Sequence, residues 1–211
     1  MKDIYTDAEE VYNNMTDIRI VKTKRHLKQA LVKMLEDTPF EKLTVAELCR
    51  RAETSRITFY THYDDKYDLT EELFDDYVNE AARDYRRLQE ENNTKRTALL
   101  GYYNMIDCIL NLYSRNRGMF AALNAEKNPY LYSAFYQHIF RSVYDFITVH
   151  RKQMTPKYPQ RQVAALICNG LWGVISECFT REDEVGKVRS DIISMFNDIL
   201  RSGIFDMHGA V

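Results

Sequence analysis

Apolar residues recur at helical spacing through most of the chain. The first clear stripe follows the i, i+3, i+4, i+7, i+8 pattern of an amphipathic helix and consists of Leu27, Ala30, Leu31, Met34 and Leu35. This helix is expected to end before Pro39, because the residue that precedes a proline avoids the helical region. No segment alternates apolar and polar residues over the length of a strand. The pattern therefore predicts an all-α protein.

The same spacing predicts two short helices after Pro39 and then a series of longer ones. A long helix begins at Lys66 and ends in the polar run at 90–96. Further helical segments are expected at 97–114, 117–125, 128–152, 160–180 and 186–202. This gives about nine helices, arranged as a small three-helix head and a larger helical body.

The two short helices have sequence signals at their starts. Thr44 and Glu47 form a capping box, in which a hydroxyl and a carboxylate bind the free amides of a helix start. Glu53 and Thr54 form a turn, and Ser55 caps a third helix that runs to Tyr63. Two short helices joined by a tight turn are the geometry of a helix-turn-helix, whose second helix enters the major groove of DNA. Residues 44–63 are therefore a candidate DNA-binding element.

The charge distribution agrees with this hypothesis, although charged helix faces are usually just solvated. Residues 18–63 carry ten Lys or Arg and five Asp or Glu, whereas the whole chain has a net charge of −2. A basic end on an acidic remainder is typical of a DNA-binding head.

The head also resembles a known family. The stretch TKRHLKQALVKMLEDTPFEKLTVAELCRRAETSRITFYTHYDDKYDL at 23–69 is similar to the N-terminal domain of TetR/AcrR-family regulators. LTVAELCRRA matches the bracing helix and SRITFY the recognition helix, while Tyr60 and Lys66 fall on the most characteristic positions. The remainder, 70–211, is similar to the family only in length and helical character.

The resemblance implies a role for each residue of the head. Arg56, Ile57 and Thr61 fall where family members contact base edges. Phosphate contacts are implied for Thr44, Ser55, Thr58, Tyr60, His62 and Lys66. Arg19, Lys22 and Lys24 are looser candidates for phosphate neutralisation. Each residue also has a plainer interpretation: Thr44 and Ser55 as helix caps, Tyr60 as core, His62 as an exposed side chain, and Lys66 as the partner of a local acid.

Two residues depart from the family pattern. Glu53 stands where the turn usually has glycine, so its backbone either avoids positive φ or tolerates modest strain. Tyr63 replaces the usual phenylalanine and adds a hydroxyl. Neither change removes a contacting group.

The body is rich in aromatic residues, with eleven in 102–146. Such stripes are more often plain core, yet small-molecule sites are apolar and aromatic with a few polar groups. The family places its effector pocket among the middle helices of the body. The candidates for effector binding are Tyr102, Tyr103, Tyr136, His138 and Tyr144.

The last two helices are candidates for a dimer interface. In the family, these helices pair with their symmetry mates, and a two-fold interface requires a self-complementary apolar face. Ordinary packing within one chain is the alternative. The candidate interface residues are Val163, Ile167, Gly170, Leu171, Val174, Cys178, Ile192, Phe196 and Ile199.

The expected domains are an acidic extension at 1–17, a helix-turn-helix DNA-binding domain at 18–65 and an effector-binding and dimerisation domain at 66–211. The expected function is that of a cytoplasmic, homodimeric transcription regulator that binds a palindromic operator in double-stranded DNA. It is expected to be a repressor released by an unknown small-molecule effector. An activator, or a DNA-binding protein controlled by a protein partner, is the alternative.

Other classes of protein are disfavoured. The chain has no H-E-x-x-H, G-x-S-x-G, glycine-rich phosphate loop or metal-spaced Cys/His set, so no catalytic residue, metal or cofactor is expected. The most apolar stretch, 163–175, is shorter than the roughly 20 residues that a membrane span requires. The N-terminus has no apolar segment typical of a signal peptide, and the four scattered cysteines are expected to be free thiols.

Overall fold

The computed structural model describes the backbone of residues 4–180 and 184–207, and the side chains of 18–177 and 184–207. The chain forms two compact units. Unit 1 comprises Met1–Leu73 and Gly118–Leu131, and unit 2 comprises Phe74–Arg117 and Tyr132–Val211. The described residues contain nine α-helices, which confirms the predicted all-α fold.

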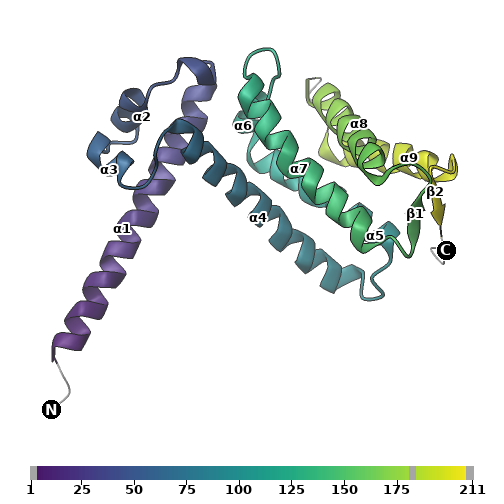
Figure 1. Ribbon diagram of the computed structural model, residues 1–211, viewed down its shortest axis with the longest axis horizontal. Coiled ribbons are helices and arrows are strands. Elements are labelled where there is room, and N and C mark those ends of the chain that lie inside the picture. The colour runs from purple at the N-terminus through teal and green to yellow at the C-terminus, as the bar shows by residue number, and fades with distance from the viewer. Residues whose placement is uncertain (1–3, 181–183, 208–211) are drawn as a thin grey trace. The chain divides into compact units, whose positions relative to one another are not determined.

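Unit 1 contains the predicted head. Its elements are α1 (Ile4–Leu35), a 3-10 turn η1 (Phe40–Lys42), α2 (Val45–Arg51), α3 (Arg56–Tyr60), the start of α4 (Lys66–Asn92), and α6 (Arg117–Ala122) from its second residue onward. In Figure 1, α2 and α3 lie beside the C-terminal half of α1. The predicted end of the first helix before Pro39 is confirmed, since α1 ends at Leu35.

The apolar stripe of α1 forms part of the hydrophobic core of the head. All five stripe residues are buried, with Leu27 and Leu31 fully inaccessible to solvent. Phe40, Leu48 and Phe59, from η1, α2 and α3, are also fully buried. Burying one such side chain contributes about 1.5–3 kcal/mol, so this shared core fixes the short helices that could not be stable alone.

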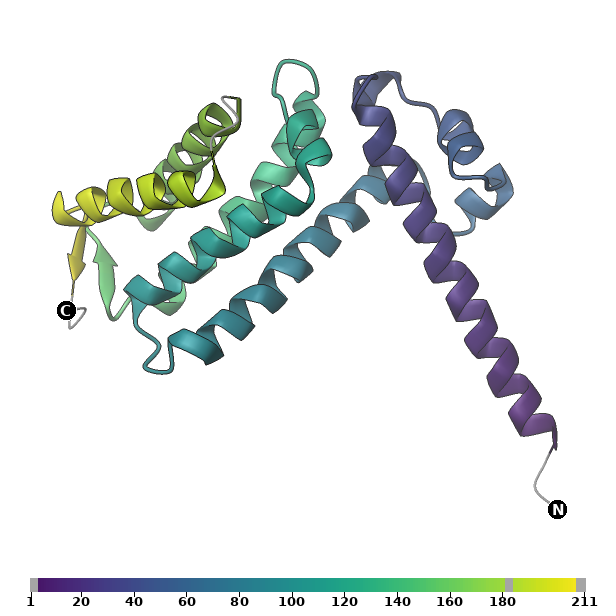
Figure 2. The ribbon, with the colours of Figure 1, turned by 180° about the vertical axis from the view of Figure 1, so that it is seen from behind.

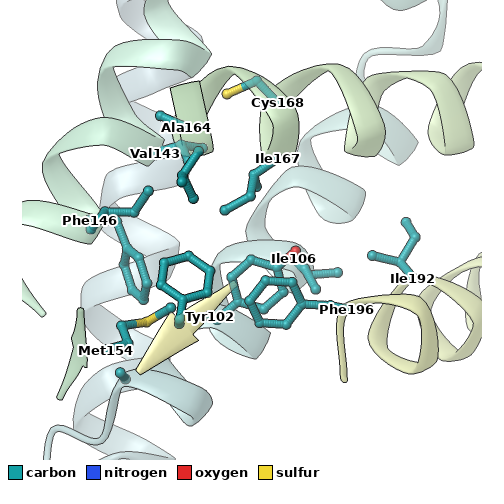
Figure 3. Close-up of a cluster of buried hydrophobic side chains, with 14 of the residues drawn as sticks. Tyr102, Ile106, Val143, Phe146, Met154, Ala164, Ile167, Cys168, Ile192 and Phe196 are labelled. Carbon is teal, nitrogen blue, oxygen red and sulfur yellow. The ribbon is translucent and has the colours of Figure 1, made fainter. Parts of the chain in front are cut away.

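Unit 2 is built from the longer helices. It contains the rest of α4, α5 (Ala98–Arg115), most of α7 (Pro129–Val149), α8 (Gln160–Thr180) and α9 (Val185–Arg201). Its core brings together side chains from α5, α7, α8 and α9 around Tyr102 and Ile106, as Figure 3 shows. The ring of Tyr102 stacks on that of Phe196, so α5 and α9 are packed directly against each other.

Unit 2 also contains a two-stranded ribbon, formed by the segment between α7 and α8 and the segment after α9. Strands β1 (Met154–Pro156) and β2 (Phe205–Met207) pair antiparallel, with Thr155 opposite Asp206 (Figure 2). Met154 and Phe205 are buried in the unit 2 core. These strands were not predicted, because three residues are too few to show an alternation of apolar and polar positions.

The boundaries of the helices from α4 onward agree with the predicted segments to within a few residues. Helix α1, in contrast, begins at Ile4, inside the segment 1–17 that was expected to form a separate extension. The third helix was expected to reach Tyr63, but α3 ends at Tyr60 and Thr61 is its C-cap. Within the described part of the chain, no helix combines the length and apolar character needed to cross a membrane.

Candidate DNA-binding site

The start of α2 has the predicted capping box. Glu47 donates its backbone N–H to Thr44 Oγ1 at 3.2 Å, and the Thr44 backbone N–H donates to Glu47 Oε2 at 3.3 Å. The Thr44 hydroxyl also donates to that carboxylate oxygen at 2.7 Å, and this hydrogen bond lowers the pKa of Glu47. The exposed Thr44 therefore acts as a helix cap in the unbound protein.

The turn between α2 and α3 adopts a conformation that is unusual for its residue. Glu53 has a φ of 52°, which lies in the left-handed region where a Cβ atom is strained. The adjacent Thr54 donates its backbone N–H to Cys49 O at 2.9 Å, which closes the turn after α2. Of the two outcomes expected for Glu53, the structure therefore shows the strained one.

The start of α3 is capped by Ser55, as predicted. Its Oγ accepts a hydrogen bond from the Thr58 backbone N–H at 3.0 Å. The hydroxyls of Ser55 and Thr58 also share a hydrogen bond at 2.8 Å. At the other end of α3, Thr61 Oγ1 donates to Ile57 O at 2.9 Å. These bonds hold a helix of only five residues in place.

The two faces of α3 differ sharply in exposure. Phe59 is fully buried and Tyr63 is 2% exposed, and their ring centroids lie 5.6 Å apart. On the outer face, Ile57 is 83% exposed and Tyr60 is 51% exposed. We call this outer face the recognition surface. It is a shallow, open hollow lined by Arg56, Ile57, Tyr60 and Thr61.

Two further predicted phosphate contacts, His62 and Lys66, follow α3 in the chain. His62 is half-buried and donates its backbone N–H to Phe59 O at 2.9 Å. Lys66, the first residue of α4, has a different environment from the one expected. Its ammonium donates to the backbone oxygens of Phe40, Glu41 and Leu43 at 2.8, 3.1 and 3.1 Å.

The basic residues of α1 fall into two groups. Arg19 and Lys22 are exposed. Lys24 instead binds Glu72 Oε2 at 2.7 Å, and Lys28 binds Oε1 of the same carboxylate at 2.7 Å. Partial burial opposes ionisation of Glu72, but the hydrogen bonds from Lys24 and Lys28 outweigh it and lower its pKa. Lys24 therefore takes part in an ion pair that ties α1 to α4.

The effector candidates have different neighbours from one another. Tyr102 is 2% exposed and belongs to the unit 2 core. The Tyr103 hydroxyl donates to Asn197 Oδ1 at 2.8 Å, and His138 Nδ1 lies 3.8 Å from Asp75 Oδ1. The other two, Tyr136 and Tyr144, share one face of α7, on which each ring stacks on Phe140.

The dimer candidates divide between the core and the surface of one chain. Four of them are buried in the unit 2 core, namely Val163, Ile167, Ile192 and Phe196. Gly170 is exposed, while Leu171, Val174 and Ile199 are half-buried, and the side chain of Cys178 lies outside the described residues. Leu166 of α8 is 54% exposed.

Several contacts in unit 1 were not anticipated from the sequence. Asn128 Oδ1 accepts a hydrogen bond from the Phe40 backbone N–H at 2.7 Å, and the Tyr130 ring stacks on Phe40. The Tyr130 hydroxyl donates to Glu71 Oε1 at 2.8 Å. These partners lie 59 to 90 residues apart, so no local pattern signals them.

Comparison with known proteins agrees with this geometry. Residues 28–73 match the family model described as "Bacterial regulatory proteins, tetR family". No curated protein matches the chain.

Solved structures share the fold over most of the chain. A candidate TetR-family transcriptional regulator of Syntrophomonas wolfei is 11% identical, covers 86% of this chain and 96% of its own, and has a TM-score of 0.69. The TetR transcriptional regulator of Streptococcus agalactiae 2603V is 20% identical, covers 87% of this chain and 98% of its own, and has a TM-score of 0.58. The dihydroxyacetone kinase operon activator DhaS is 15% identical, covers 85% of this chain and 96% of its own, and has a TM-score of 0.52.

The family match spans the capping box of α2, the turn at Glu53, the recognition surface of α3 and the start of α4. The solved structures show that the helical body has the same fold as well. Residues 28–73 thus match the tetR family of bacterial regulatory proteins, and the chain as a whole shares the fold of solved TetR-family regulators.

Proposed function

We propose that the protein is a sequence-specific repressor that binds a palindromic operator as a homodimer and is released by a small-molecule effector. In this proposal, residues 18–65 bind DNA, residues 66–211 bind the effector and dimerise, and 1–17 form an acidic extension. The protein acts in the cytoplasm, where its operator is accessible. The observation that carries the proposal is the recognition surface, where a large apolar residue, Ile57, is left 83% exposed on a capped helix.

Base recognition is assigned to three residues of α3. The Arg56 guanidinium binds the O6 and N7 atoms of guanine, and Ile57 contacts a thymine methyl group, as major-groove chemistry allows. Thr61, which lines the same hollow, contacts a neighbouring base edge.

Phosphate contacts are assigned to Thr44, Ser55, Thr58, Tyr60 and His62. Only one of the two hydroxyl hydrogens of Ser55 and Thr58 is used in the bond between them, so the other is left to donate to a phosphate oxygen. Such contacts fix the register of the protein on DNA without reading its sequence.

The dimer is assigned to the part of α8 that the single chain leaves uncovered. Gly170 and Gly173 are exposed, and an added Cβ at either would meet nothing within 4 Å. A second α8 is therefore able to approach closely there, next to Leu171 and Val174. Ile199 extends this face, whereas the four buried candidates support it from within.

The effector is assigned to the half-buried polar candidates Tyr103, Tyr136, His138 and Tyr144. Their hydroxyl and imidazole groups combine apolar surface with hydrogen-bonding atoms, as small-molecule sites do. Tyr102 has a packing role, since its ring is enclosed by the core. Effector binding acts by favouring one of two conformers of the dimer, to the extent of its differential affinity for them.

A second candidate function is activation of transcription. DhaS, which has the same fold, is described as an operon activator. Control by a protein partner is a further alternative. It is favoured by the stacking of Tyr102 on Phe196, because these two rings fill part of the region that the resemblance assigned to an effector.

The DNA assignment is tested by selecting duplexes from a random pool and comparing Arg56→Ala with Tyr60→Ala. Arg56→Ala should weaken binding to the selected site by about 10- to 100-fold and relax the preference at one base position. Tyr60→Ala should weaken binding to all sequences alike. Unchanged affinity and preference in Arg56→Ala would contradict the assignment of that residue.

The effector assignment is tested by a thermal-shift screen of small molecules. A true effector binds the native state and raises the midpoint of unfolding, and it should also release the selected duplex. A compound that stabilises the protein and strengthens DNA binding would favour the activator or co-repressor alternative. Sedimentation of the wild type and of Gly170→Leu then tests whether α8 forms the dimer.

A further inference from the structure

Lys66 has no hydrogen-bond donor left for DNA. An ammonium group carries three N–H donors and no acceptor. In this protein those donors meet three backbone oxygens, on Phe40, Glu41 and Leu43, at 2.8 to 3.1 Å. A phosphate contact would require at least one of these bonds to break.

The three oxygens belong to the segment that leads into the helix-turn-helix. Phe40 and Glu41 lie in η1, and Leu43 immediately precedes Thr44, the N-cap of α2. Lys66 itself is the first residue of α4, directly after the α3 region. Its side chain therefore connects the two ends of the helix-turn-helix within unit 1.

Aromatic rings hold the ammonium in this position. Its Nζ lies 4.7 Å from the centroid of the Phe40 ring and 5.4 Å from that of Tyr67. The Phe40 ring in turn stacks on Tyr130, and the Phe40 N–H is bound by Asn128. A cation between aromatic faces and carbonyl oxygens is in a compact site that suits an ammonium better than a planar guanidinium.

We propose that Lys66 is a positioning residue, which fixes the geometry of the helix-turn-helix by binding three carbonyl oxygens, and that it does not contact DNA phosphate. The proposal rests on the DNA-binding function of the head and changes the role that the family resemblance implied for this residue. DNA affinity depends on Lys66 because α2 and α3 depend on it.

Two substitutions separate the two roles. Lys66→Met keeps the length of the side chain but removes its charge and donors. Lys66→Arg keeps the charge, which would preserve a phosphate contact, but its planar donors do not fit three converging carbonyls. Lys42→Met removes a positive charge from an exposed side chain of η1 and is the matched control.

The first measurement is thermal unfolding without DNA. Lys66→Met and Lys66→Arg should each lower the midpoint by about 4 °C or more, because hydrogen bonds to a charged group are lost. Lys42→Met should leave the midpoint unchanged. Wild-type stability in both Lys66 variants would overturn the proposal.

The second measurement is affinity for a mixed-sequence DNA duplex over a range of salt concentrations. Loss of one phosphate contact reduces the slope of log K against log salt by about 0.9. Disturbing the arrangement of α2 and α3 should instead lower the affinity at every salt concentration without changing that slope. We expect both Lys66 variants to give weaker, parallel lines. Full affinity in Lys66→Arg, or a slope reduced by about 0.9 in Lys66→Met alone, would overturn the proposal.

A third measurement needs no variant that must fold. In the wild-type protein, the ¹⁵N-labelled ammonium of Lys66 should be protected from exchange with water before any DNA is added, and its signal should stay unchanged on titration with the duplex. Protection that is seen only with DNA would overturn the proposal. If no duplex binds at any salt concentration, the proposed function fails, while the unfolding and exchange measurements still decide the role of Lys66.

Discussion

Helix α3 of unit 1 and helix α5 of unit 2 differ in the exposure of their large side chains. In α3, Ile57 is 83% exposed and Tyr60 is 51% exposed, and only Phe59 is fully buried. In α5, Tyr102 and Ile106 are at most 2% exposed, and they lie at the centre of a core formed by four helices. Folding accounts for the apolar residues of α5. It does not account for the exposure of Ile57, whereas the proposed contact with a thymine methyl group does.

The largest expected effect comes from the two faces of α3 itself. Phe59→Ala removes a fully buried ring and should lower the free energy of unfolding by about 3–5 kcal/mol. Ile57→Ala should change it by less than about 0.5 kcal/mol, because the side chain has almost no contacts to lose. Urea unfolding measures both. If Ile57→Ala proved as destabilising as Phe59→Ala, the recognition surface would be part of the fold and the comparison would fail.

The same comparison of a buried and an exposed position is possible in unit 2, at Gly101 and Gly173. A Cβ atom on Gly101 of α5 would lie 3.1 Å from Gln89 Nε2, 3.1 Å from Tyr85 Oη and 3.2 Å from Phe146 Cε2. Gly101→Ala should therefore cost about 1–2 kcal/mol net, even though alanine favours the helix. Gly173→Ala meets nothing in the single chain and should stabilise the helix by about 0.5–1 kcal/mol.

The proposed dimer gives Gly173→Ala a second expected effect, on the association of two chains. If α8 packs closely against a second copy at Gly173, Gly173→Ala should weaken the dimer while it stabilises the helix. Sedimentation at a series of concentrations separates the two effects. An unchanged dissociation constant would remove Gly173 from the proposed interface.

Local rules predicted the head well because its signals act within a few residues. The capping box at Thr44 and the cap at Ser55 need partners only three positions away, and the stripe on α1 needs one helix. The role of Lys66 was beyond such rules, since its carbonyl partners lie 23 to 26 residues away and are set by the fold of unit 1.

The body was harder to interpret from sequence for a different reason. Periodicity predicts that a side chain is covered, but it does not say what covers it. Ile192 and Phe196 follow the same apolar spacing whether they pack within one chain or against a second copy. The structure buries both in the core of a single chain, and it likewise encloses Tyr102, which the aromatic content of the body had suggested for a pocket.

A smaller effect is expected from two strained residues, one in each unit. Glu53 and Arg96 both have a φ of 52°. A glycine at either position removes a Cβ strain of about 1–2 kcal/mol from the folded state. It also loses about 0.5–1 kcal/mol more chain entropy on folding. Glu53→Gly and Arg96→Gly should therefore each raise the free energy of unfolding by about 0.5–1 kcal/mol. Only Glu53→Gly should also strengthen DNA binding, since it removes a negative charge beside the recognition helix. Equal DNA affinities in the two variants would show that Glu53 is too far from DNA to influence it.

The smallest effect concerns the ion pair between α1 and α4. Glu72 has a lowered pKa, so its contribution to stability is complete above the ordinary pKa of a glutamate and is lost as the pH falls through the lowered value. Because the carboxylate is partly exposed, solvent screens it, and Glu72→Gln should cost about 1 kcal/mol or less at neutral pH. The difference from the wild type should shrink below about pH 4. Glu36→Gln, which breaks an exposed pair with Lys33, is the control and should cost less at every pH. Stability curves that stay equally far apart down to low pH would show that Glu72 acts through packing rather than through its charge, and α1 would then be held to α4 by its apolar stripe alone.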